Sequence, residues 1–131
     1  MSKPYTKKEL ELFEKIGREW ELILGLQDWD IDYRLAKKRE RSNYRAKVVM
    51  NRSAMNATML LCERDTPPSP LPLKVCLELD VIHELLHLTL RPLTLLAETR
   101  FNVDSEDMDY EEHRIIQRLV KLLMGARCST G

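Results

Sequence analysis

The spacing of hydrophobic residues divides the chain into a first helix, a group of short strands and a second, helical half. Apolar residues recur at steps of three and four from Thr6 to about Leu26, which predicts an amphipathic helix. Thr6 and Glu9 have the spacing of a capping box, and Gly25 marks the end of the helix. The stripe that we expect to be buried consists of Leu10, Phe13, Ile16, Trp20, Ile23 and Leu24.

After this helix, apolar and polar residues alternate, which is the period of a strand with one face toward the core. The alternation predicts strands at residues 29–35 and 46–50, and the basic stretch Lys37–Arg45 between them predicts a loop or hairpin connection. A third strand is expected at Met55–Cys62. Because the last residues of this segment are apolar at every position, a helix is the alternative for it.

Four prolines in residues 63–72 exclude regular structure there and separate the two halves of the chain. Helical periodicity returns from about Leu73 to Arg91, where Pro92 is expected to stop or kink the helix. Residues 93–97 are expected to add a short further turn.

A polar and acidic segment then leads to a final helix from about Asp109 to Met124, with Gly125 just past its end. A division into two domains would leave about 60 residues on each side of the proline-rich segment, which makes two marginal cores. The pattern therefore predicts a single domain over residues 1–131, of the α+β class, with one long loop.

The composition is that of a globular domain, with 131 residues of which 44% are hydrophobic and 32% charged. Lys plus Arg and Asp plus Glu each total 21, so the formal net charge is zero. We therefore expect neither nucleic acid nor an anionic membrane to be a partner through general electrostatics. The basic stretch Lys37–Lys47 is more typical of a solvated loop, although it supports nucleic-acid association as a minor interpretation.

The cysteines point away from a disulfide framework. Cys62, Cys76 and Cys128 are odd in number, far apart and without a CxxC pair, so neither disulfides nor a thiolate zinc site is indicated. Charged residues and histidines interrupt the most apolar stretch, residues 75–90, which excludes a membrane span. The first residues lack the apolar core of a signal peptide, and we expect a cytoplasmic location.

The second helix contains the motif H-E-x-x-H, as His83-Glu84-Leu85-Leu86-His87. Residues four apart on a helix lie one turn above each other, so His83 and His87 can direct both imidazoles to a single zinc ion. Glu84 lies beside that stripe, where a carboxylate can take a proton from a water that zinc has acidified. The motif predicts a hydrolytic zinc site, and the alternative is a pair of buried structural histidines.

A catalytic zinc commonly has three protein ligands, so a third must come from outside the motif. Glu112 is our choice, because it lies three, four and seven residues before Ile115, Ile116 and Leu119 and continues the buried face of the last helix. Its alternative role is a capping box with Asp109. The fallback ligands are Glu111 and His113.

These residues resemble the gluzincin group of zinc metallopeptidases, in which a glutamate ligand on a second helix follows H-E-x-x-H. More narrowly, the chain is similar to small metallopeptidases encoded by bacteriophages and prophages. The similarity lies in His83–Leu88 in an apolar helix, in Pro92 shortly after it, and in Glu111-Glu112 and Ile115-Ile116 at the final helix. It covers about residues 27–123, and only the H-E-x-x-H part is highly specific.

The resemblance implies a minimal zincin-like fold, with an N-terminal helix, a sheet of about three strands, an active-site helix and a C-terminal helix. It implies a zinc metallopeptidase that acts on a peptide or protein substrate, in the cytoplasm of a bacterium or of a phage-infected host. One zinc ion per chain would be held by His83, His87 and Glu112, with Glu84 as the general base. The alternative is a catalytically inactive zinc-binding regulatory or interaction module on the same scaffold.

Two further roles follow from the resemblance. In zincins an edge strand beside the active-site helix holds the substrate extended, and Met55–Cys62 is the candidate for that strand here. The residue that stabilises the oxyanion is left open among Tyr110, His113 and Arg114, which are chosen only because they are near in sequence.

Overall fold

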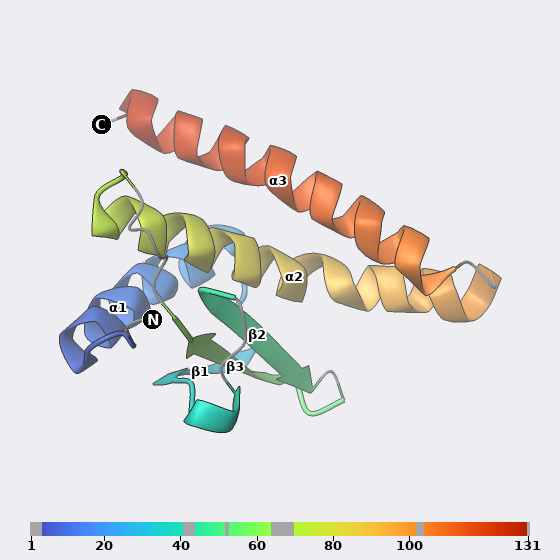
Figure 1. The fold of residues 1–131 in the computed structure, drawn as a ribbon. Coiled ribbons are helices and arrows are strands. Elements are labelled where there is room, and N and C mark those ends of the chain that lie inside the picture. Colours follow the sequence, from blue (N-terminus) through green and yellow to red (C-terminus); the bar gives the residue numbers. More distant parts are fainter. Residues whose placement is uncertain (1–3, 41–43, 52, 64–69, 102–103, 131) are drawn as a thin grey trace.

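The computed structural model describes the chain apart from residues 1–3, 41–43, 52, 64–69, 102–103 and 131. It is an α+β arrangement with an N-terminal helix, a small sheet and two further helices (Figure 1). In order, its elements are α1 (Lys7–Leu24), β1 (Asp30–Leu35), the 3-10 turn η1 (Lys38–Glu40), β2 (Ala46–Asn51), β3 (Asn56–Leu61), α2 (Leu73–Phe101) and α3 (Ser105–Thr130). The fold class predicted from the sequence is thus confirmed.

Both ends of α1 form as their local sequence predicts. The Thr6 amide donates to Glu9 Oε1 at 2.7 Å and the Glu9 amide donates to Thr6 Oγ1 at 3.3 Å, which completes the capping box. Gly25 follows the helix with φ of 71°, a left-handed conformation that glycine adopts without steric cost. The prediction that Ile23 is buried was wrong. Ile23 is 56% exposed, and Leu26 returns to the core after the turn instead.

The sheet has the strand order β1–β3–β2, in which β3 runs parallel to β1 and antiparallel to β2. Alternate residues of β3 face opposite sides. Met59 and Leu61 belong to the main core, whereas Leu60 lies with Cys62 and Ala36 in a second, small buried cluster. Because both faces of β3 are buried near its C-terminal end, residues 59–62 are all apolar. The segment is a strand, and the helical alternative was wrong.

The interpretation of Met55–Cys62 as an edge strand was wrong, because β3 is the central strand and both of its edges are paired. The edge strand that packs against the helix with the H-E-x-x-H motif is β2, which contacts α2. Its exposed positions alternate with half-buried ones and include the charged Lys47, a pattern typical of an edge.

The sequence also misplaced three helix boundaries, namely the end of α2 and both ends of α3. α2 does not stop at Pro92 but continues to Phe101, so that residues 93–97 are part of it. A proline inside a helix costs about 3 kcal/mol, and the packing of α2 against α1, β2 and α3 compensates for this cost. The α3 helix begins at Ser105, where Asp104 Oδ1 accepts from the Glu106 amide at 2.8 Å, and it passes through Gly125.

Helix α1, the sheet and helix α3 are arranged around the central helix α2. Helix α1 packs on β1 and on α2, α2 packs on β2, and α3 lies along α2 on the side away from α1 and the sheet (Figure 1). A buried hydrogen bond from Trp20 Nε1 to Glu78 Oε2, 3.0 Å long, joins α1 to α2. The largest fully buried side chains of the core are Trp20, Phe13, Ile31, Met59, Leu61, Leu77, Ile82, Leu85, Leu88 and Ile116.

The close approach of α1 to β1 depends on a glycine. A Cβ added at Gly17 would overlap with the Tyr33 ring and its hydroxyl. The Tyr33 ring cannot easily move aside, because its hydroxyl donates to Glu21 Oε2 at 2.6 Å and Arg18 lies over its face.

We therefore expect Gly17→Ala to lower the free energy of unfolding by about 1–3 kcal/mol, the usual cost of overpacking. Gly125→Ala is the matched control. Its added Cβ meets no atom within 4 Å, and alanine in a helix is about 1 kcal/mol better than glycine. Urea denaturation measures both variants, and equal stability of the two would contradict the proposed contact.

Candidate metal site

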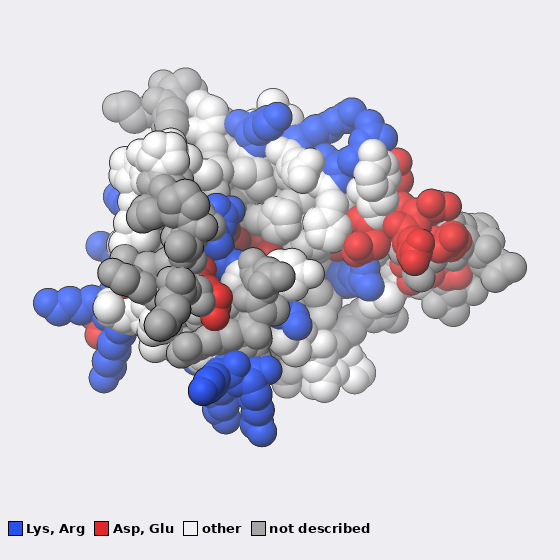
Figure 2. Space-filling view, in the orientation of Figure 1, with Lys and Arg blue, Asp and Glu red and all other residues white. Residues whose placement is uncertain are grey.

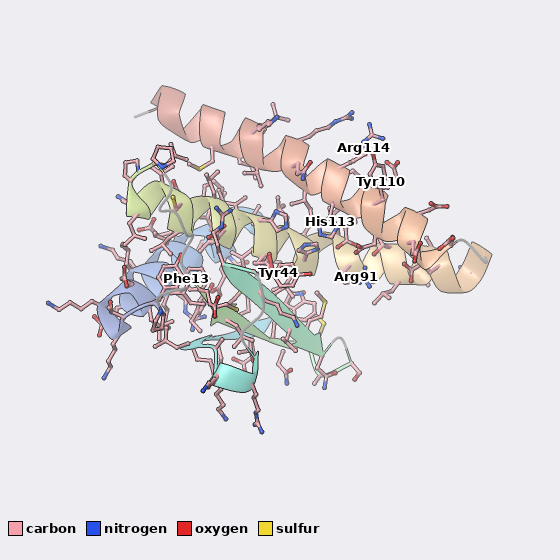
Figure 3. All side chains as sticks on the ribbon, in the orientation of Figure 1. Phe13, Tyr44, Arg91, Tyr110, His113 and Arg114 are labelled. Carbon is pink, nitrogen blue, oxygen red and sulfur yellow. The ribbon has the colours of Figure 1, made fainter. Side chains whose placement is uncertain are left out.

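Three histidines from two helices meet at one point. His83 and His87 lie one turn apart on α2, and His113 extends toward them from α3 (Figure 3). Each offers one nitrogen, and these three atoms lie within 4.8 Å of one another. In the part of the chain that the structure describes, this is the one group of three or more His, Cys, Asp or Glu side chains close enough to hold a metal ion.

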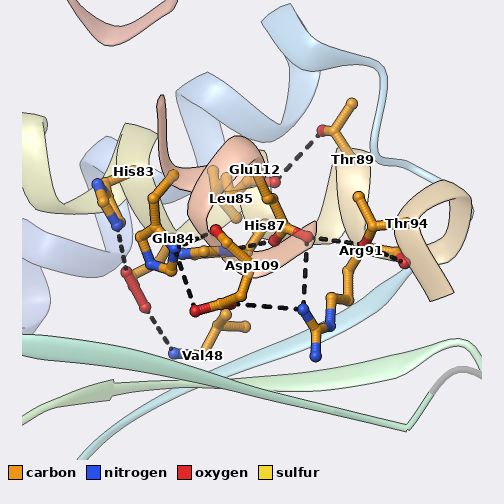
Figure 4. Close-up of polar contacts among 11 residues, drawn as sticks. Val48, His83, Glu84, Leu85, His87, Thr89, Arg91, Thr94, Asp109 and Glu112 are labelled. Atoms are coloured by element: carbon orange, nitrogen blue, oxygen red, sulfur yellow. Dashed lines mark hydrogen bonds and ion pairs between the residues drawn. The ribbon is translucent and has the colours of Figure 1, made fainter. Parts of the chain in front are cut away.

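Glu112 fixes the orientation of His87. Its Oε1 lies 2.6 Å from His87 Nδ1, and its Oε2 accepts from the Thr94 hydroxyl at 2.8 Å (Figure 4). The side chain is fully buried. Burial alone would raise its pKa, but the hydrogen bonds from His87 and Thr94 and the charge of Arg91 together lower the pKa of Glu112 below its usual range. Glu112 is therefore a carboxylate at neutral pH. Its contact with Nδ1 leaves His87 Nε2 as the nitrogen that could bind a metal ion.

Asp109 makes the corresponding contact to His113. The backbone oxygen of Asp109 lies 2.9 Å from His113 Nδ1, and its carboxylate lies 3.6 Å from the same atom. Arg91 joins the two carboxylates, because its Nη1 is 3.6 Å from Asp109 Oδ1 and 3.5 Å from Glu112 Oε2 (Figure 4). Two of the three histidines thus have one ring nitrogen held by a partner on α3.

His83 is kept neutral by its surroundings. Burial, and after it the charges of the neighbouring histidines and of Arg45, lower the pKa of His83 to about 4. At neutral pH its imidazole is uncharged. The uncharged form is the one that binds a metal ion.

Glu84 is anchored to the sheet edge. Its Oε1 accepts from the Val48 amide of β2 at 3.0 Å, and its Oε2 lies 3.8 Å from His83 Nε2 (Figure 4). Burial raises the pKa of Glu84 to about 8. The hydrogen bond from Val48 lowers this pKa, and the negative charge of Asp80 raises it further. With neutral His83, this contact is not an ion pair. A cation bound nearby would favour the carboxylate form of Glu84.

A groove opens beside these residues. It has a volume of about 620 Å³ and is bounded by the chain just before and at the start of β2, by α2 and by α3. His83 and Glu84 are part of its wall. A molecule in the groove would therefore reach both residues from solvent.

The structure brings together His83, Glu84 and His87, as the motif predicts. Of the two fallback ligands, His113 lies with the two motif histidines. It places Glu112 against His87 rather than among the three clustered nitrogens. The capping-box alternative for Glu112 was wrong, because α3 begins four residues before Asp109. Glu111, the other fallback ligand, is exposed and pairs with Arg114 at 3.2 Å.

Two of the three candidates for oxyanion stabilisation lie outside the site. Tyr110 is 65% exposed, and Tyr110 and Arg114 extend from the outer side of α3, away from His113 (Figure 3). Sequence reasoning missed Arg91 and Thr94. They follow His87 by four and seven residues and so lie on the same helix face, which is a spacing that could have indicated them.

Charged side chains are distributed unevenly over this face of the molecule. Acidic residues gather at the right of the view, over the first turns of α3, and basic residues project at the lower edge, where η1 lies (Figure 2). Lys37 and Lys38 are exposed, in keeping with a solvated turn, whereas Arg41 of the same basic stretch lies outside the described residues.

Comparisons with protein-family models, with curated proteins and with solved structures found no match to this chain. Within the described residues, no helix is long and apolar enough to cross a bilayer.

The contacts of Glu112 predict a measurable contribution to stability even without metal. Glu112→Ala leaves the half-buried His87 Nδ1 without its partner and removes one of the two carboxylates that Arg91 contacts, and we expect the free energy of unfolding to fall by about 1–3 kcal/mol. Glu111→Ala is the control, because an exposed pair such as Glu111–Arg114 contributes about 0–1 kcal/mol. Denaturant unfolding in the presence of a chelator measures both. Equal losses would show that Glu112 is not a structural link.

Proposed function

We propose that the protein is a zinc-dependent metallopeptidase. The observation that carries the proposal is the convergence of three histidines from α2 and α3 on one point, with Glu84 beside them at the wall of an open groove. Three nitrogen ligands with a position left for water are typical of a catalytic zinc site, whereas a structural site is closed by four protein ligands.

The donor set fits zinc in chemistry and nearly in geometry. Zinc–nitrogen bonds of about 2.0–2.1 Å in a tetrahedron bring ligand nitrogens to roughly 3.4 Å from one another. The three nitrogens already lie within 4.8 Å, so small side-chain rotations on two packed helices would suffice. Two of the histidines also have the acceptor on the second ring nitrogen that metal-binding imidazoles usually have.

In this proposal His83, His87 and His113 hold the metal, and Glu112 positions His87. A bound zinc ion would supply Lewis acidity, lowering the pKa of a water molecule toward about 7 and polarising the carbonyl of the scissile bond. Glu84 would accept the proton of the attacking water and return it to the amine when the C–N bond breaks. The Val48 amide would hold the Glu84 side chain in place through Oε1 and leave Oε2 for the proton.

Zinc binding separates the two candidate third ligands. We expect about one zinc ion per chain, and His113→Ala should lower the affinity for zinc by more than Glu112→Gln does. Loss of an outer partner such as Glu112 typically costs about 10–100-fold in metal affinity. Competition with a chromophoric chelator measures the affinities, and Glu111→Gln serves as the control. The opposite order of the two effects would assign Glu112 as the ligand.

Turnover tests the role of Glu84. Glu84→Gln should abolish peptide cleavage, measured with a casein substrate and with a fluorogenic peptide mixture, while zinc content stays at the level of the wild type. The amide keeps the shape of the side chain and cannot accept the proton. If Glu84→Gln cleaves as fast as the wild type, the mechanism is wrong. If neither protein cleaves while both bind zinc, the inactive zinc-binding module is the better interpretation.

A further inference from the structure

The hairpin of α2 and α3 places residues opposite one another in a regular order. The two helices run antiparallel, with α3 returning along α2 (Figure 1). Arg91 Nη1 lies 3.6 Å from Asp109 Oδ1, and the rings of His87 and His113 have centroids 4.8 Å apart. Contacts between the helices therefore step four residues back along α2 for every four residues forward along α3.

The next step along the hairpin reaches the groove. It pairs His83 of α2 with Gln117 of α3, and both residues line the groove together with Glu84. Gln117 lies one helical turn, a rise of about 6 Å, beyond His113. Of the α3 residues that line the groove, Gln117 is the one nearest along the helix to His113.

The side chain of Gln117 offers hydrogen-bond donors to the groove. Gln117 is exposed, and within the described part of the chain no hydrogen bond engages its carboxamide. Its NH2 group can therefore donate to an oxygen atom of a molecule in the groove. The carboxamide is neutral, so unlike a lysine or an arginine at this position it does not repel a cation bound to the histidines.

The other side-chain donors of the groove are less suited to contact a molecule bound at the histidines. Arg45 is held by Asp80, with Arg45 Nη2 3.0 Å from Asp80 Oδ1. Lys121 follows His113 by eight residues, which is a rise of about 12 Å along α3. Tyr44 lies outside the helices and strands, and side chains on those elements are held more precisely.

We propose that Gln117 is a catalytic residue, whose side-chain amide donates a hydrogen bond to the carbonyl oxygen of the scissile bond. This oxygen gains negative charge when water adds to the carbonyl carbon, so the donor stabilises the transition state more than the ground state. The hydrogen stays on the amide nitrogen. Glu84 on α2 and Gln117 on α3 then contact the reacting atoms from different walls of the groove. This inference rests on the proposed peptidase function, since it adds a residue to the same site.

Inhibitor binding tests the assignment without turnover. A library of phosphinic peptides, in which a tetrahedral anionic group replaces the scissile amide, is selected on the zinc-loaded wild type, and a thiol peptide with the same side chains serves for comparison. Gln117→Leu should weaken binding of the selected phosphinic peptide about tenfold or more, because a charge-assisted hydrogen bond is lost. Affinity for the thiol peptide and zinc content should stay unchanged. Gln27→Leu, the same substitution at an exposed site outside the groove, should change neither affinity.

Steady-state kinetics give a second measure of the same hydrogen bond. On a peptide that the wild type cleaves, Gln117→Leu should lower kcat by about 10²–10³-fold, the usual effect of removing one oxyanion donor. KM should change little, because the carbonyl oxygen carries less charge in the ground state. A rise in KM at unchanged kcat would make Gln117 a substrate-binding residue only and would contradict the inference.

Equal affinity of the wild type and Gln117→Leu for the phosphinic peptide, or a library from which none binds, would overturn the inference. A loss of affinity in Tyr44→Phe in place of Gln117→Leu would assign the donor to Tyr44. Failure of the inference is distinguishable from failure of the proposed function. If the wild type and Gln117→Leu cleave peptides equally fast, the function stands and the inference is lost. If zinc-loaded protein binds phosphinic peptides through Gln117 but cleaves nothing, Gln117 remains the donor and the peptidase is lost.

Discussion

The burial of α2 is the constraint on which the rest of the structure depends. This helix is apolar around most of its circumference, so it must be covered by α1, by β2 and by α3 at the same time. The stripe that carries His83 and His87 is only half-buried, and it borders both β2 and α3. The covering elements therefore supply the partners of the site, with Val48 from one side and Glu112 and His113 from the other.

The polar groups at this stripe form two sets with opposite electrostatic character. Around His87, the carboxylate of Glu112 is kept ionised by a histidine, a hydroxyl and a guanidinium. Around His83, burial favours the neutral forms of both His83 and Glu84. In the proposed metal site, the first set would hold His87 in a fixed orientation. The second would leave Glu84 as a base whose charge depends on what binds nearby, and a hydrolytic metal site uses both properties.

Local features of the fold could be predicted from the sequence and nonlocal ones could not. The capping box of α1 and the spacing of His83 and His87 involve residues within one turn, and both are as predicted. The choice between Glu112 and His113 depends on the rotation of α3 about its axis, since neighbouring positions on a helix differ by about 100°. The central place of β3 depends on strand order, and the passage of α2 through Pro92 depends on packing that outweighs local propensity.

The attachment of α3 has a consequence for how the site opens. This helix packs mainly on α2, and it follows α2 directly at one end of the molecule (Figure 1). Separation of α3 would remove His113 and Glu112 from the site while α1, the sheet and α2 kept their shared core. The site is thus held together by a single interhelical contact, whose opening is a smaller event than global unfolding. Any ligand that bridges α2 and α3 adds its binding free energy to the contact between these two helices. Binding of the ligand and packing of α3 on α2 are therefore linked equilibria.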